Sequence, residues 1–225
     1  MLLSVDWDYY SGTVEHTFDA PIWGSRDREE DRVEAWRARA RKRGGADWEV
    51  LAEDFPLHGD PTGLSRYMGR PTFVAWSHAS AWAWLERFPR REVVNFDSHH
   101  DLYSSSGDPE RVRPGNWAGL ALKRQLVTRY TCVYPAWHEN VRVAEGFDLG
   151  RTRGEIEQAR PDVAPFVALS RGDALPPAES VEAVLLVQSP SWTNPAHDDV
   201  FLDLASRLDA EELTAPYRRS FNERF

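Results

Sequence analysis

Residues 71–101 read PTFVAWSHASAWAWLERFPRREVVNFDSHHD and contain the pattern that most clearly indicates the fold. Two short apolar runs, at 71–76 and 92–96, enclose a segment at 79–87 that has the length of a short helix. Continuous apolar runs of this length are typical of strands buried on both faces, and a helical crossover connects parallel strands. The stretch therefore predicts a parallel sheet that is covered by helices.

The rest of the chain repeats this alternation. Apolar runs predict strands at 1–5, 128–134, 164–170 and 181–187, and the segments that accompany them predict helices at 116–126, 151–160 and 198–208. Strands that alternate with helices in this way predict an α/β protein, a three-layer α/β/α fold with a mostly parallel sheet.

One segment departs from the alternation. Residues 27–43, DREEDRVEAWRARARKR, place acids first and bases last, as the helix dipole favours, and Gly44 and Gly45 follow them. We interpret residues 25–70 as a helical insertion in a single domain that spans residues 1–225, because this length is in the range of one domain.

Charge and composition exclude several classes of protein. The chain has 36 Asp and Glu against 27 Lys and Arg, so its net charge of -9 would repel nucleic acids and anionic membranes. Its single cysteine, Cys132, excludes an internal disulfide framework and a multi-cysteine zinc site. No apolar run has the length of a membrane span, and the acidic N-terminus does not resemble a signal peptide. We therefore expect a cytoplasmic protein that acts on a small molecule.

Acids and histidines follow the predicted strands, at the edge of a parallel sheet where ligands bind. Asp97, His99 and Asp101 alternate after the strand at 92–96, so their side chains are expected on one side of the extended chain. Two carboxylates and an imidazole suit a divalent ion such as Mn, Fe or Zn. Solvated acids beside a core histidine are the alternative.

Two other strand ends carry residues of the same kind. Asp6 and Asp8 follow the strand at 1–5 and share one face, and two like charges among apolar and aromatic neighbours are costly without a cation. His78 follows the strand at 71–76. Because that strand directly precedes the strand of Asp97, we expect the two to be near neighbours in the sheet.

His78 followed by Asp97-Ser98-His99-His100-Asp101 resembles the arginase/agmatinase (ureohydrolase) superfamily, whose relatives include the histone-deacetylase fold. Its members carry Gly-Gly-Asp-His-Ser, then Asp-Ala-His-x-Asp, then a late Ser-x-Asp-x-Asp, and the spacing from His78 to Asp97 is close to that of the family. Gly115-Asn116-Trp117-Ala118-Gly119 is similar to the family's Gly-Asn-x-His-Gly. An uncharacterised arginase-related group shares Asp-Ser-His-x-Asp-Leu and a downstream Asn-Trp.

The resemblance implies an arginase/deacetylase-like fold and one or two divalent ions, with Mn preferred over Zn or Fe. Two departures stand out. Ala118 replaces the proton-shuttling histidine of arginases, and Ser189 and Ser191 occupy the places of the late aspartates. Asp6 and Asp8 resemble that missing pair, so a rearranged topology would restore the set. The implied metal ligands are then Asp6, Asp8, His78, Asp97, His99 and Asp101.

The implied function is that of a metal-dependent hydrolase, in which metal-activated water attacks a C–N bond of a guanidine, amidine or amide. The candidate catalytic residues are Asp101 and either His138 or Glu139, which follow the strand at 128–134 and would replace the missing shuttle. The candidate substrate-binding residues are Asn116, Trp117 and Trp192, although aromatic packing explains the tryptophans equally well.

Two other functions stay open at this point. The replacements at Ala118, Ser189 and Ser191 also fit a catalytically degenerate, arginase-fold binding protein. Asp6 as nucleophile and Asp8 as acid/base fit a haloacid-dehalogenase-like phosphatase, but that function leaves Asp97 and Asp101 unexplained. Related enzymes commonly form homo-oligomers, and the oligomeric state is left open.

Overall fold

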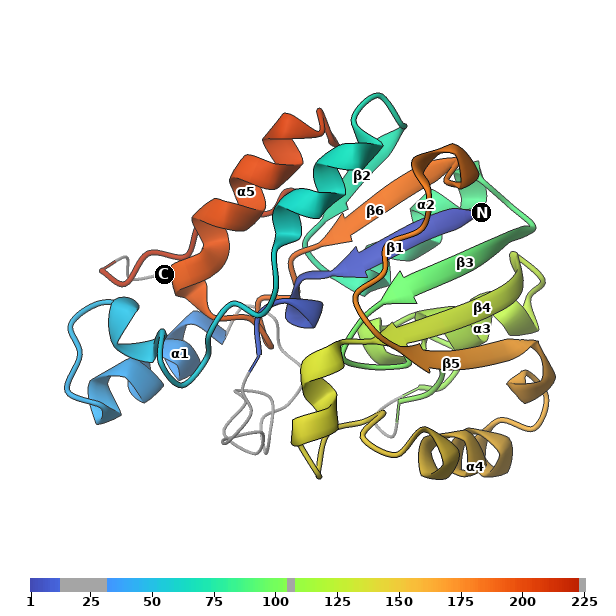
Figure 1. Ribbon diagram of the computed structural model, residues 1–225, viewed down its shortest axis with the longest axis horizontal. Helices are drawn as coiled ribbons and strands as arrows, with labels where there is room; N and C mark the ends of the chain where they lie inside the picture. The colour runs from blue at the N-terminus through green and yellow to red at the C-terminus, as the bar shows by residue number, and fades with distance from the viewer. Residues whose placement is uncertain (13–31, 105–107, 223–225) are drawn as a thin grey trace.

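The computed structural model describes residues 1–12, 32–104 and 108–222 of the chain, and its centre is a parallel sheet (Figure 1). Within these residues the sheet has seven strands in the order β5-β4-β3-β1-β6-β2-β7, and each neighbouring pair is parallel. The strands are β1 (Leu2–Asp6), β2 (Thr72–Ala75), β3 (Arg91–Phe96), β4 (Val127–Tyr134), β5 (Val167–Arg171), β6 (Ala183–Val187) and β7 (Glu211–Glu212).

The apolar runs bury both faces of this sheet. Along β1, Leu2 belongs to one core cluster and Leu3 to a second one, because successive side chains of a strand point to opposite faces. In β6, Leu185 joins the first cluster and Val184 the second. The central strands β1 and β6 are buried along their whole length; β6 is entirely apolar, and β1 carries two buried polar residues, Ser4 and Asp6.

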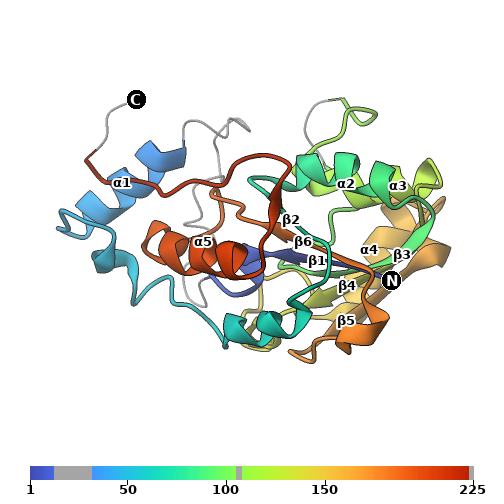
Figure 2. The same cartoon turned by 90° about the horizontal axis from the view of Figure 1, so that it is seen from above.

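Helices cover the two faces. The first cluster packs against α2 (Ala81–Arg87), α3 (Trp117–Lys123) and α4 (Leu149–Ala159), and the second against α5 (Asp198–Arg207) and the 3-10 helix η5 (Pro61–Tyr67). Figure 2 shows α2 and α3 on the face opposite α5. The prediction of a three-layer α/β/α fold with a mostly parallel sheet is confirmed, and no helix in the described part of the chain is long and apolar enough to cross a membrane.

Short 3-10 helices connect these elements, and several of them follow strand ends directly. Besides η5, the described residues contain η1 (Trp7–Tyr9), η4 (Glu49–Leu51), η6 (His78–Ser80), η7 (Pro114–Asn116), η8 (Ala136–Asn140), η9 (Ala164–Phe166), η10 (Ala178–Ser180) and η11 (Pro195–His197).

The segment interpreted as an insertion forms a small core of its own. Helix α1 (Arg32–Lys42) packs Trp36 against Phe55, with their ring centroids 5.1 Å apart. The indole N–H of Trp36 donates to the carbonyl of Pro190, which ties α1 to the loop after β6. The predicted start of this helix, at 27–31, lies outside the described residues.

One expectation about the sheet is wrong. The strand of His78, β2, is not a near neighbour of the strand of Asp97, β3, because β1 and β6 lie between them. Adjacency along the chain favoured the pairing, but β1 and β6 occupy the centre of the sheet and β2 lies next to the edge strand β7. His78 must therefore reach across the ends of β6 and β1 to approach Asp97.

Candidate metal centre

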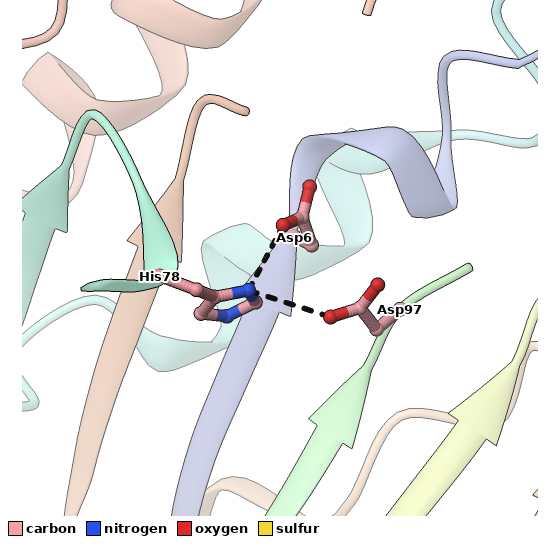
Figure 3. Close-up of side chains that lie close together, drawn as sticks. All are labelled: Asp6, His78 and Asp97. Carbon is pink, nitrogen blue, oxygen red and sulfur yellow. Dashed lines mark ion pairs between the residues drawn. The ribbon is translucent and has the colours of Figure 1, made fainter. Parts of the chain in front are cut away.

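Three strand ends bring acids and a histidine together at the carboxyl edge of the sheet. Asp6 is the last residue of β1, Asp97 follows β3, and His78 opens η6 after β2 (Figure 3). All three side chains are buried, and one ligand atom from each lies within 4.8 Å of the others. They belong to the face of the sheet that α2 and α3 cover, because Ser4, Asp6 and the core residue Leu2 alternate along β1.

The imidazole of His78 stands among carboxylates. Its Nδ1 lies 3.0 Å from Oδ2 of Asp6, 3.1 Å from Oδ2 of Asp101 and 3.4 Å from Oδ2 of Asp97. Its other nitrogen, Nε2, lies 2.9 Å from the hydroxyl of Ser4. The ring thus presents Nδ1 to the acids and is held from behind by a strand hydroxyl. A ligating histidine is held in this way when its second nitrogen has a hydrogen-bond partner.

A second group of ligand atoms shares Asp97 with the first. It consists of Asp8, Asp97 and His99, whose ligand atoms also lie within 4.8 Å of one another. Nδ1 of His99 lies 2.9 Å from Oδ2 of Asp8 and 3.6 Å from Oδ1 of Asp97. Asp97 therefore offers one oxygen to each group, as a carboxylate that bridges two cations would.

Backbone and side-chain contacts fix these acids before any cation binds. Oδ1 of Asp6 accepts the N–H of Asp8, and Oδ1 of Asp8 accepts the N–H of Ser98. Asp6 also accepts a short hydrogen bond from the hydroxyl of Ser189 in the loop after β6. Two of the turns that leave the strands are therefore arranged around the carboxylates.

The electrostatics of the group are compatible with a bound cation. Burial, together with the charge of Asp8, raises the pKa of Asp6 to about 6, and burial with three neighbouring carboxylates raises the pKa of Asp97 well above its usual range. Burial alone lowers the pKa of His78, but its hydrogen bonds to Asp101 and Asp6 outweigh that effect and raise it well above its usual value. Four carboxylates and two imidazoles in this space fit a divalent ion, which would neutralise the acids.

Asp101 reaches the group from the end of the loop 97–101. It has a φ of 54°, in the left-handed region, and its Oδ2 accepts the indole N–H of Trp117 at 2.7 Å. Its backbone carbonyl accepts the N–H groups of Ala118 and Gly119. The structure thus brings all six of the predicted metal ligands to one edge of the sheet.

A cavity of about 640 Å³ opens beside the second group. Asp8 and His99 lie at its wall, and Trp137 and Trp192 add aromatic surface. The ring of Trp192 lies 4.5 Å from that of His99, centroid to centroid. The predicted substrate-binding residue Trp192 therefore stands where a small molecule in the cavity would meet His99.

The two candidate proton shuttles, His138 and Glu139, differ in position. His138 lines the cavity, whereas Glu139 is exposed and is not among the lining residues. Nδ1 of His138 lies 2.7 Å from the carbonyl of Glu145, and burial lowers the pKa of His138 to about 4, so the ring is neutral near pH 7. A neutral ring that donates from Nδ1 keeps a lone pair on Nε2.

Asn116 and Trp117 do not line this cavity. The Asn116 side chain bonds to the backbone of Arg111 and Arg113, and Trp117 is fully buried against His78. Sequence reasoning missed the hydroxyls of Ser4 and Ser189. The signal for Ser4 was its place two residues before Asp6 on the same face of a buried strand.

In comparisons with known proteins, no family model, no curated protein and no solved structure matches the chain.

Proposed function

We propose that this protein is a metal-dependent hydrolase that uses a cation-activated water to cleave a C–N bond of a small substrate. The observation that carries the proposal is the pair of ligand groups that share Asp97 and lie beside a cavity. A set of four carboxylates and two imidazoles is rich in oxygen, which suits Mn²⁺ better than Zn²⁺. The shared carboxylate supports two ions rather than one.

A bound divalent ion supplies a lowered pKa for its coordinated water and polarises the bond under attack. The chain's own residues supply the rest. His138, with Nδ1 bonded to Glu145, would accept or donate a proton at Nε2, the task that Ala118 cannot perform. Trp192 and Trp137 would orient the substrate and exclude bulk water from the wall at His99.

We further propose that the chain is related to the arginase-like enzymes. The position of one serine replacement supports this relation: Ser189, which stands where a late aspartate is expected, donates its hydroxyl to Asp6. Strands β1 and β6 are adjacent in the sheet. An aspartate pair at the end of β1 instead of the end of β6 is therefore displaced by only one strand, and it still lies near Asp97.

The test combines metal analysis with turnover. Apoprotein that is dialysed against Mn²⁺ should retain up to two ions per chain by elemental analysis, and should then hydrolyse one member of a panel of guanidino, acylamino and acetyl-lysine compounds. Asp97→Asn should abolish both properties. Asp203→Asn, in the exposed part of α5, is the matched control and should change neither.

The two other functions are separate outcomes of this experiment. Stoichiometric Mn²⁺ without turnover of any compound would favour the degenerate binding protein. Magnesium-dependent phosphatase activity that is inhibited by beryllium fluoride and lost in Asp6→Asn would favour the phosphatase. A protein that takes up no transition metal would overturn the metal centre itself.

A further inference from the structure

Trp117 contacts two of the proposed ligands at once. Its indole Nε1–H donates to Oδ2 of Asp101 at 2.7 Å, and its ring stacks on the imidazole of His78 with centroids 5.0 Å apart and planes 23° apart. The side chain is fully buried, and its ring also packs edge-on against Tyr130. No other residue in the described part of the chain is seen to contact this pair of ligands in both ways.

The first turn of α3 also holds the backbone of Asp101. The carbonyl of Asp101 accepts the N–H of Ala118 at 3.1 Å and that of Gly119 at 3.3 Å. These bonds offset the cost of a non-glycine residue in the left-handed region. Gly119 is required for the close approach, because a Cβ atom there would lie 2.0 Å from the carbonyl oxygen of Leu102. Backbone and carboxylate of Asp101 are thus fixed by one helical turn.

We infer that Trp117 is a positioning residue for the Asp101/His78 end of the metal centre. This inference rests on the proposed metal centre. The indole N–H occupies one lone pair of Oδ2 and fixes the carboxylate rotamer, so that little side-chain entropy is lost when a cation binds. The stacked ring fixes the plane of His78. Partners of this kind, behind the ligands, commonly change metal affinity by about 10–100-fold.

The effect is selective for one end of the centre. Asp8 and His99 have their own supports, namely the N–H of Ser98 and the ring of Trp192. Neither of them has a hydrogen bond or ring contact with Trp117 among those the structure shows. Losing the indole N–H should therefore weaken the ion held by Asp101 and His78 and spare the ion held by Asp8 and His99.

The variant that tests this is Trp117→Phe, which keeps an aromatic ring for stacking but removes the N–H donor. Trp84→Phe is the matched control, because Trp84 is equally buried in the same core cluster and its indole nitrogen has no hydrogen-bond partner in the described structure. Titration calorimetry with Mn²⁺ gives the affinities, and the absorption spectrum of the Co²⁺ form reports the ligand geometry. Thermal melting of the apoproteins checks that the wild-type protein and both variants fold.

In Trp117→Phe we expect the affinity for one ion to fall about 10–100-fold. The affinity for any second ion and the melting temperature of the apoprotein should be close to those of Trp84→Phe. Gly119→Ala, which pushes the same turn away from Leu102, should produce the same selective loss and serves if Trp117→Phe does not fold. Wild-type affinities in Trp117→Phe, or an equal loss in Trp84→Phe, would overturn the inference alone. A wild-type protein that binds no ion would instead overturn the proposed function.

Discussion

Ser4 contributes a single hydroxyl to the candidate metal centre, on the side of His78 that faces away from the carboxylates. When Nδ1 of His78 ligates a cation, Nε2 carries the hydrogen and donates it to the Ser4 oxygen, 2.9 Å away. We predict that Ser4→Ala weakens Mn²⁺ binding about tenfold, because the ring loses the partner that fixes its tautomer and plane. Titration calorimetry measures the change.

The control for this prediction is Ser206→Ala, at an exposed position of α5, which should bind Mn²⁺ as the wild-type protein does. An unchanged affinity in Ser4→Ala would show that packing alone orients the ring. A loss of folding would be visible as an altered far-ultraviolet spectrum of the apoprotein.

The sequence identified the acids and histidines of the candidate centre because they directly follow apolar strands. Alternation grouped Asp97 with His99, as the structure does, but it also paired Asp6 with Asp8, which the structure assigns to different ligand groups because the chain turns into η1 after Asp6. It said less about residues beyond the strand, where the backbone turns. Asp101 adopts a left-handed conformation, and Trp117 consequently meets it from inside the core rather than from the cavity. The roles of all these residues as ligands stay predictions.

At the scale of elements, the C-terminal segment fastens the loop after β6. The Arg219 side chain is completely buried and makes paired hydrogen bonds with Asp198 in the first turn of α5. It also donates to the carbonyls of Pro190 and Thr193, at 2.6 and 2.9 Å. That loop contains Ser189 and Trp192, so its position determines one wall of the candidate site.

We predict that Arg219→Met lowers the free energy of unfolding by about 3–5 kcal/mol, because it leaves the Asp198 carboxylate buried without its partner. Arg218→Met is the matched control. Arg218 pairs with Asp199 on the surface, where an ion pair contributes little, so the free energy should hardly change. Urea unfolding of both variants measures the difference. Equal losses of unfolding free energy in the two variants would show that Arg219 does not stabilise the loop after β6.

The limits of most helices and strands lie close to the predicted ones, although residues 164–166 form η9 instead of the start of a strand, and the predicted neighbour of β2 is wrong. An apolar run reports that a strand is buried, whereas the identity of its neighbours depends on the whole set of strands. Chain adjacency favoured β2 beside β3, and the structure pairs β2 with β6. The short edge strand β7 was missed because its two glutamates carry no apolar signal.

For the protein as a whole, the buried carboxylates of the candidate centre lower the stability of the folded apoprotein, and a bound cation would remove this cost. Binding to the folded state alone stabilises a protein by about 2.7 kcal/mol when the free ion is at 100 times its dissociation constant, and a chain of this size gains about 2–4 °C per kcal/mol. We therefore predict that Mn²⁺ raises the melting temperature by about 5–10 °C over the apoprotein in EDTA. The rise should be larger at pH 8 than at pH 6, because His78 and His99, whose pKa values are raised, must lose their protons to ligate.

The Asp97→Asn variant is a more specific test of the same effect. The raised pKa of Asp97 means that its charged form destabilises the folded apoprotein, and increasingly so as the pH rises through that pKa. This variant should thus melt above the wild-type apoprotein at pH 8 and gain nothing from Mn²⁺. A variant that still gains from Mn²⁺ would show that Asp97 is not needed to hold the ion, whereas a variant that melts lower would show that the hydrogen bonds from Asn95 and His99 outweigh the cost of the charge.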